Sequence, residues 1–189
     1  ALGRDDGPVS DEDYETNTGT RDRVVLFGDG AGAVVVEARD DGDAGVIDSL
    51  LHTNGDEAER LWTKASGSAF RPYISQDMID SGDVTPIVEG RKVYAIAVTF
   101  MPQVTLEILE RNELTLDDLD LVIFHQANLR INEGVQKRLG LPDDKVFNNI
   151  QNYGNTTAGT IPIAYHEALE QGLVKTGDLV AFVGLGSGL

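Results

Sequence analysis

The architecture of this chain is set by one short segment, Leu121-Val122-Ile123-Phe124-His125-Gln126-Ala127-Asn128-Leu129-Arg130. Its first four residues are a continuous apolar run, as expected for a strand that is buried on both faces. Apolar residues then recur at helical spacing from about Asn128 to Leu139, and Gly140 follows as a helix-ending residue. We therefore predict a strand that leads directly into a helix, with His125 at the carboxyl end of the strand.

Strands and helices are predicted to alternate on both sides of this segment. Apolar residues at helical spacing indicate helices from Val93 to about Asn112 and from Ile161 to about Gly172. Apolar and β-branched runs indicate strands at residues 24–27, 33–36, 44–53, 146–147 and 179–183. Such alternation is typical of a layered α/β fold.

A glycine-rich segment, Gly28-Asp29-Gly30-Ala31-Gly32, separates the first two predicted strands. A dinucleotide-binding loop would need a helix after the glycines, so that amide groups could point at phosphate. A β-branched run follows instead. The glycines are therefore expected to allow either a tight bend between paired strands or the close approach of another backbone segment.

The composition limits the function classes. The chain has 189 residues, 15 Lys and Arg against 32 Asp and Glu, and a formal net charge of −17. Binding to nucleic acid or to an anionic membrane depends on basic residues, so neither partner is expected. The acidic excess is interpreted as a solvated surface, with adaptation to high salt as an open alternative. No apolar run reaches the roughly 20 residues of a membrane span, and a cytoplasmic enzyme without membrane insertion is expected.

The chain contains no cysteine, which excludes disulfides and thiolate metal sites, and no metal site is predicted. The candidate chemistry lies instead in a histidine and an asparagine. His125 ends the predicted buried strand, and Asn155 lies in the glycine-bounded segment Tyr153-Gly154-Asn155-Thr156-Thr157-Ala158-Gly159. A neutral imidazole and a carboxamide can both donate hydrogen bonds to one developing oxyanion, which suggests carbonyl chemistry. Taken singly, His125 could be a structural histidine and Asn155 a turn residue.

Four blocks of sequence, in this order and spacing, resemble the C-terminal half of a ketoacyl-acyl-carrier-protein synthase III of the thiolase superfamily. The blocks are Phe27–Ala33, His125–Ile131, Tyr153–Ala158 and Gly184–Leu189. The resemblance implies one half of an α-β-α-β-α sandwich, with a mixed five-stranded sheet and helices on both faces. Residues 1–22 would then be a loop or tail of the preceding half. Residues 23–189 would be the C-terminal thiolase-like domain, truncated at the glycine-rich loop.

The resemblance also implies roles for individual residues. His125 and Asn155 match the His and Asn of a Cys-His-Asn active site, and the backbone amide of Ser187 matches an oxyanion-hole donor. Asn128 matches a residue that binds the phosphopantetheine of CoA or of the carrier protein. The basic residues Arg130, Lys137 and Arg138 suit docking of an acidic acyl carrier protein, although they could equally be a plain solvated helix face. Thr156 and Thr157 are expected to cap the following helix.

The implied reaction is a decarboxylative Claisen condensation of acyl-CoA with malonyl-carrier protein, in the initiation of fatty acid or polyketide synthesis. Acyl-CoA and malonyl-carrier protein are substrates, and no cofactor is expected. The nucleophilic cysteine would lie in a missing N-terminal half, and the complete enzyme would be a homodimer. Two alternatives remain open. One is a condensing enzyme of the same superfamily that does not decarboxylate its substrate, and the other is a non-catalytic module that binds acyl thioesters or carrier proteins.

Overall fold

Strand β3 (Leu121–Phe124) is the centre of the protein, and all four of its residues are buried. It pairs in parallel with β4 (Val146–Phe147) on one side and with β5 (Val180–Val183) on the other. Successive side chains of a strand point to opposite faces. Accordingly Val122 and Phe124 join one apolar cluster and Leu121 and Ile123 join another. The buried strand predicted at this position is confirmed.

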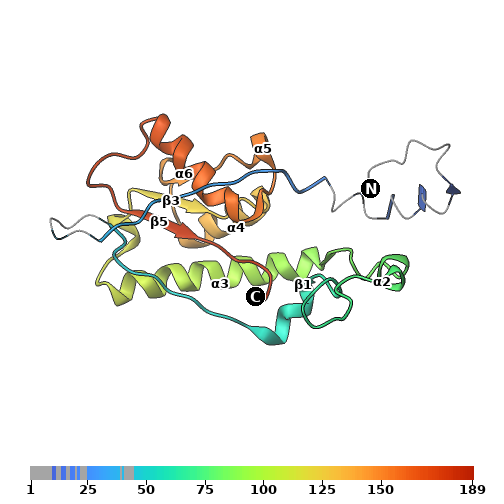
Figure 1. The fold of residues 1–189 in the computed structure, drawn as a ribbon. Coiled ribbons are helices and arrows are strands. Elements are labelled where there is room, and N and C mark those ends of the chain that lie inside the picture. Colours follow the sequence, from blue (N-terminus) through green and yellow to red (C-terminus); the bar gives the residue numbers. More distant parts are fainter. Residues whose placement is uncertain are drawn as a thin grey trace.

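Helices cover both faces of this sheet, as Figure 1 shows for α6 (Thr160–Glu170) and the long helix α3 (Gly90–Arg111). The cluster around Val122 and Phe124 includes residues of α3 and of α4 (Leu129–Leu139). The cluster around Leu121 and Ile123 includes residues of α6. The predicted helices and the predicted layered α/β fold with helices on both faces are therefore confirmed.

The computed structural model describes residues 25–38, 40 and 45–189, together with isolated positions between 10 and 21. The loop or tail expected over residues 1–22 lies largely outside the described residues. The remaining short elements are η1 (Gly55–Arg60), β1 (Leu61–Trp62), α2 (Gln76–Asp80), β2 (Ile87–Val88), η2 (Leu116–Asp118), η3 (Asp143–Lys145), α5 (Ile150–Tyr153) and η4 (Thr157–Gly159). Strands β1 and β2 form a separate antiparallel pair.

The sheet differs from the expected one in its strand count. Within the described residues it has three parallel strands, in the order β4-β3-β5, rather than five strands of mixed direction. The strands predicted at 33–36 and 44–53 do not form there, and Val35 is 96% exposed and Leu51 91% exposed. Their β-branched composition suits a strand, but a strand also needs a neighbour with free backbone groups. Neither segment pairs with β4 or β5, the two outer strands of this sheet, through backbone hydrogen bonds.

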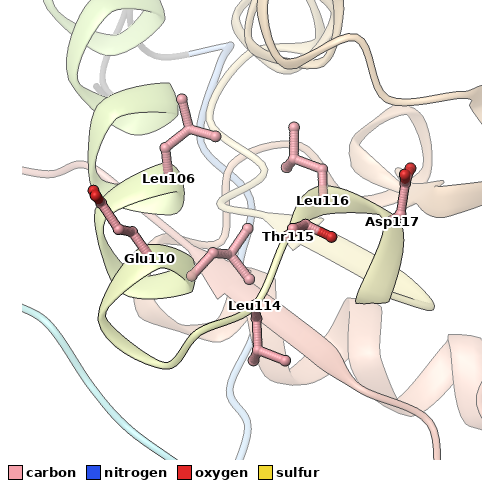
Figure 2. A pocket seen from close by; sticks show the side chains of 7 residues that line it. Leu106, Glu110, Leu114, Thr115, Leu116 and Asp117 are labelled. Atoms are coloured by element: carbon pink, nitrogen blue, oxygen red, sulfur yellow. The ribbon is translucent and has the colours of Figure 1, made fainter.

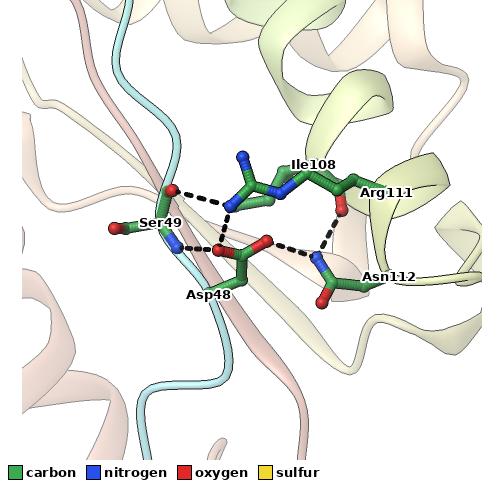
Figure 3. A network of polar contacts seen from close by, with 5 residues as sticks. All are labelled: Asp48, Ser49, Ile108, Arg111 and Asn112. Atoms are coloured by element: carbon green, nitrogen blue, oxygen red, sulfur yellow. Dashed lines mark hydrogen bonds and ion pairs between the residues drawn. The ribbon is translucent and has the colours of Figure 1, made fainter.

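The segment around Asp48 is held instead by side chains at the end of α3 (Figure 3). One carboxylate oxygen of Asp48 accepts from the Arg111 guanidinium, and the other accepts from Nδ2 of Asn112 at 2.8 Å. The Asn112 amide also donates to the Ile108 carbonyl at 2.8 Å, which secures the last turn of the helix. Hydrogen bonds from Asn112 and Arg111 hold the pKa of Asp48 below its ordinary value.

The glycine-rich segment lies against the loop that precedes α6. The Gly28 N–H donates to the Asn155 carbonyl at 3.0 Å, and the Asn155 N–H donates to the Leu26 carbonyl at 2.8 Å. A Cβ atom at Gly28 would lie 2.0 Å from the Tyr153 carbonyl oxygen, which no side chain could tolerate. Of the two predicted uses of these glycines, close approach of another backbone is confirmed.

Helix α3 buries one stripe of its surface, which consists of Val93, Ala97, Met101, Pro102, Thr105 and Leu109. Phe100 is 45% exposed because it lies beside this stripe. Among the described residues, α3 alone is long and apolar enough to span a membrane by length and composition. It packs against α4 and contributes to the cluster around β3, as a core helix does.

Pro102 leaves one carbonyl of α3 without its usual partner, because proline has no N–H to donate to the residue four positions earlier. That residue is Val98, and its carbonyl accepts instead from Nη1 of Arg138 in α4 at 3.1 Å. The same nitrogen reaches the Thr99 hydroxyl at 3.4 Å. Arg138 thus connects α4 to α3, a structural role that the sequence did not indicate.

This pairing predicts a specific coupling between two substitutions. Arg138→Met should lower the free energy of unfolding by about 1 kcal/mol, because it removes a hydrogen bond to an orphaned carbonyl. In a Pro102→Ala background the new backbone N–H at position 102 can satisfy Val98, so the cost of Arg138→Met should fall. Urea unfolding of the four proteins measures this coupling. Lys137→Met, at the adjacent exposed position, is the control and should change little; equal costs of Arg138→Met in both backgrounds would refute the pairing.

Candidate active site

His125 follows β3 directly, at the carboxyl end of the sheet where sites of parallel α/β folds are usually built. Its backbone N–H donates to the Val183 carbonyl at 2.8 Å, so the sheet pairing continues through the residue. A Cβ atom at Gly184 would lie 3.5 Å from the His125 Cβ. The start of the C-terminal glycine-rich loop therefore lies beside the histidine, as expected for residues that end neighbouring strands.

The imidazole of His125 is half-buried and has one polar partner in the described part of the chain. Its Nδ1 lies 2.6 Å from the hydroxyl oxygen of Thr160, the first residue of α6. Burial lowers the pKa of His125 below its ordinary value because the charged form loses solvation. At neutral pH the ring is therefore uncharged, and it carries one proton that can reside on either nitrogen.

The side chain of Asn155 is oriented by the turn that follows it. Its Oδ1 accepts from the Thr157 N–H at 2.8 Å, which leaves the Nδ2 amide as the end that can donate to a ligand. Its backbone is fixed on both sides by the pairing with residues 26–28. Hydrogen bonds therefore fix both the backbone and the side chain of Asn155.

A continuous chain of hydrogen bonds connects the two residues. Asn155 Oδ1 accepts from the N–H of Thr157, and the Thr157 carbonyl accepts from the backbone N–H of Thr160. The Thr160 hydroxyl, 3.0 Å from the same carbonyl, contacts His125. Thr157 has φ of +54°, a conformation that is unusual for a β-branched residue. Such a conformation persists only where the surroundings enforce it. Thr156 and Thr157 were predicted to cap the next helix, but the Thr156 side chain makes no capping bond to η4, and α6 begins without one.

The glycine-rich segment, residues 28–32, packs against the same turn, residues 155–160. Gly159 approaches that segment so closely that a Cβ atom would lie 3.0 Å from the Gly30 carbonyl oxygen. Gly30 in turn faces Thr156, whose methyl group would lie 2.8 Å from a Cβ at that position. Two of the sequence blocks, far apart in the chain, therefore form one packed unit around Asn155.

Gln126 is a supporting residue to which the sequence analysis gave no role. Its side chain is 1% exposed, and its Nε2 donates to the Phe124 carbonyl at 2.7 Å. Its Oε1 accepts from the backbone N–H groups of Asn149 and Ile150 at 3.1 and 3.3 Å. Gln126 thus joins the end of β3 to the start of α5, the helix that leads to Asn155. A buried amide directly after a strand was the available signal, since buried polar groups are nearly always hydrogen-bonded.

The other residues that the sequence singled out lie apart from this chain of hydrogen bonds. Asn128 caps α4, with its Oδ1 accepting from the Arg130 N–H at 3.0 Å. The Ser187 hydroxyl donates to the Leu61 carbonyl at 2.7 Å, while its backbone N–H has no partner among the described residues. Arg130 and Lys137 are exposed, and the described residues offer their side chains no hydrogen bond or ion pair. Arg138 differs from them because it binds α3.

His52 and His166 are exposed and pair with Glu107 and Glu170. No group of three or more His, Asp or Glu side chains in the described part of the chain could hold a metal ion.

A shallow apolar hollow lies between the end of α3 and η2, next to the start of β3 rather than its carboxyl end (Figure 2). Neither His125 nor Asn155 lines it.

Known proteins provide an independent comparison. Residues 109–189 match the family model described as 3-oxoacyl-[acyl-carrier-protein (ACP)] synthase III C terminal, and residues 12–55 match the model for 3-oxoacyl-[acyl-carrier-protein (ACP)] synthase III. Over 169 residues the chain is 43% identical to beta-ketoacyl-[acyl-carrier-protein] synthase III of Caldanaerobacter subterraneus subsp. tengcongensis. Over 170 residues it is 42% identical to the protein of the same name from Acaryochloris marina. Each alignment covers 89% of this chain and 50% of the relative, so the chain spans about half the length of the curated relatives it matches.

Solved structures agree with the sequence comparison. The beta-ketoacyl-[acyl carrier protein] synthase III of Thermus thermophilus superimposes with a TM-score of 0.64 at 36% identity, over 74% of this chain and 42% of that one. The 3-oxoacyl-[acyl-carrier-protein] synthase III of Aquifex aeolicus VF5 gives a TM-score of 0.60, also at 36% identity, over 73% of this chain and 39% of that one. These matches support the thiolase-like α/β fold.

The buried state of His125 predicts how stability depends on pH. The folded protein holds the pKa of this group below 6.5, so the unfolded chain binds the proton first as the pH falls. The free energy of unfolding should therefore decrease as the pH is lowered through about 6.5, and this decrease should end once the folded protein also binds the proton. The His125→Gln variant should not show this pH-dependent part of the free energy of unfolding.

Urea unfolding at several values between about pH 8 and pH 5 measures this component as the difference between the wild-type and His125→Gln profiles. His166→Gln is the control, since it removes an exposed histidine, and its profile should follow the wild type. Parallel profiles for wild type and His125→Gln would contradict the assignment of a buried neutral imidazole.

Proposed function

Because the chain belongs to the 3-oxoacyl-[acyl-carrier-protein] synthase III family, we propose that it forms the C-terminal part of an acyl-transferring condensing enzyme. The proposed reaction is the decarboxylative Claisen condensation of an acyl group, delivered by acyl-CoA, with malonyl-carrier protein. Such a reaction initiates fatty acid or polyketide synthesis. The observation that carries the proposal is the hydrogen-bonded chain from Asn155 through the backbone of Thr157 and Thr160 to His125.

The proposed task of His125 and Asn155 is to stabilise an enolate. When the bond between the malonyl carboxylate and its neighbouring carbon breaks, carbon dioxide leaves and the electron pair moves toward the thioester oxygen. That oxygen gains nearly a full negative charge. Nε2–H of His125 and Nδ2–H of Asn155 would donate to it, and each preorganised donor of this kind is typically worth about 3 kcal/mol in the transition state. The enolate carbon then attacks the acyl thioester, whose thiolate leaves.

The acyl thioester cannot be formed by a cysteine of this chain, because the chain has none. We propose that the nucleophilic cysteine belongs to the half of the enzyme that this sequence does not cover, on the same or a separate polypeptide. The apolar segments 34–36 and 46–47 support a covering partner, since their side chains are more than half exposed. We further propose that the complete enzyme is a homodimer and is cytoplasmic.

The carrier protein would dock on α4 beside His125. Arg130 and Lys137 lie seven residues apart, on one side of the helix, and in the described chain both side chains are free to meet an acidic partner. Arg138, which hydrogen-bonds to α3, would contribute less than the other two. The capping bond occupies Oδ1 of Asn128, so its Nδ2 would be the group that binds phosphopantetheine, while the Ser187 amide would face the acyl thioester oxygen.

A binding-only module is the second candidate, and the absence of cysteine favours it. Such a module would bind acyl thioesters or carrier protein without needing His125 as a donor. A condensing enzyme that does not decarboxylate its substrate is the third candidate. Release of carbon dioxide separates the leading proposal from both, because decarboxylation requires the two donors but no bond to cysteine.

The test is the rate at which this chain releases carbon dioxide from a radiolabelled malonyl thioester. The wild-type chain should exceed the uncatalysed rate, and His125→Ala or Asn155→Ala should each lower kcat by about 100-fold to 1,000-fold. His166→Ala is the matched control, since it removes an exposed histidine. If the wild-type chain binds the thioester but releases no carbon dioxide, or if His125→Ala leaves the rate unchanged, the proposal fails.

A further inference from the structure

Thr160 is 3% exposed, and its hydroxyl has two acceptors within reach but only one proton to donate. The Nδ1 atom of His125 lies at 2.6 Å and the Thr157 carbonyl oxygen at 3.0 Å. If the hydroxyl donates to the carbonyl, Nδ1 must carry the imidazole proton. If the hydroxyl donates to Nδ1, the imidazole proton must be on Nε2. The direction of one hydrogen bond therefore decides the tautomer of His125.

Two observations favour donation to His125. The Thr157 carbonyl already accepts the backbone N–H of Thr160, so it does not depend on the hydroxyl for a partner. The shorter of the two distances is also the one to Nδ1.

We propose that Thr160 is a positioning residue whose hydroxyl donates its proton to Nδ1 of His125 and so keeps the imidazole proton on Nε2. The tautomer follows from the geometry alone, whereas its catalytic consequence rests on the proposed function. With the proton on Nε2, the outward nitrogen is a hydrogen-bond donor, as the stabilisation of an enolate oxygen requires. With the proton on Nδ1, the same nitrogen would be an acceptor and would repel that oxygen.

The test measures the tautomer and the reaction in the same protein. The chain has three histidines, so a spectrum of ¹⁵N-labelled imidazole groups is simple, and His125→Gln identifies the signals of His125. In the wild type, Nε2 should have the shift of a protonated nitrogen and Nδ1 that of an unprotonated nitrogen that accepts a hydrogen bond. Thr160→Val keeps the shape of the side chain and removes the hydroxyl, so it should mix the two tautomers.

The same variant should lower kcat for carbon dioxide release by about 10-fold to 100-fold, as loss of a histidine's supporting partner does elsewhere, with little change in KM. Thr160→Ser retains the hydroxyl and should restore both the spectrum and the rate. Thr105→Val is the matched control, because Thr105 is another buried threonine whose hydroxyl donates to a backbone carbonyl, that of Met101 at 2.7 Å. It should alter neither readout. Thr160→Ala serves as a second hydroxyl-free variant should valine disturb the start of α6.

The outcomes separate the two proposals. A proton on Nδ1 in the wild type, or unchanged His125 signals in both hydroxyl-free variants, would overturn the role of Thr160 whatever the reaction rate. Signals that respond as predicted in a protein that releases no carbon dioxide would support the role of Thr160 and would refute the proposed reaction.

Discussion

The short turn from Asn155 to Thr160 is the constraint on which the site depends. Its backbone amide at Thr157 fixes the carboxamide of Asn155, and its last residue contacts the imidazole of His125. One turn therefore orients two side chains that are thirty residues apart in sequence. Catalytic donors are effective when they are already in place before charge develops, because no reorganisation is then needed during the reaction. Thr157, within this turn, has an unusual positive φ. Backbone strain of this kind is common at functional sites.

The rest of the protein supports this turn from two directions. On one side, β3 is buried on both faces and places His125 at its end, and Gln126 joins that end to the helix before Asn155. On the other side, the glycine-rich segment packs closely against the turn: a Cβ atom at Gly30 would lie 2.8 Å from the Thr156 methyl group, and one at Gly159 would lie 3.0 Å from the Gly30 carbonyl oxygen. A site held by a central strand and two packed loops is more rigid than one carried by a free loop.

Much of this arrangement could be predicted from the sequence. The buried strand 121–124, the helices that follow and the positions of His125 and Asn155 all follow from local periodicity and turn residues. The strands predicted at 33–36 and 44–53 were wrong, because strand formation depends on a pairing neighbour and not on β-branched composition alone. The roles of Arg138 and Thr160 could not be predicted, since each depends on a contact with a residue 35 or more positions away. A threonine at the start of a helix ordinarily indicates a cap, and only the structure places it beside an imidazole.

The central claim is that one imidazole and one carboxamide share a single thioester oxygen. A crystal structure of this chain with a malonyl-thioester analogue that cannot lose its carboxylate tests it most directly. The account predicts that Nε2 of His125 and Nδ2 of Asn155 both lie about 2.7–3.1 Å from that oxygen. An analogue bound with the two side chains directed into separate regions, and with no oxygen shared between them, would contradict it.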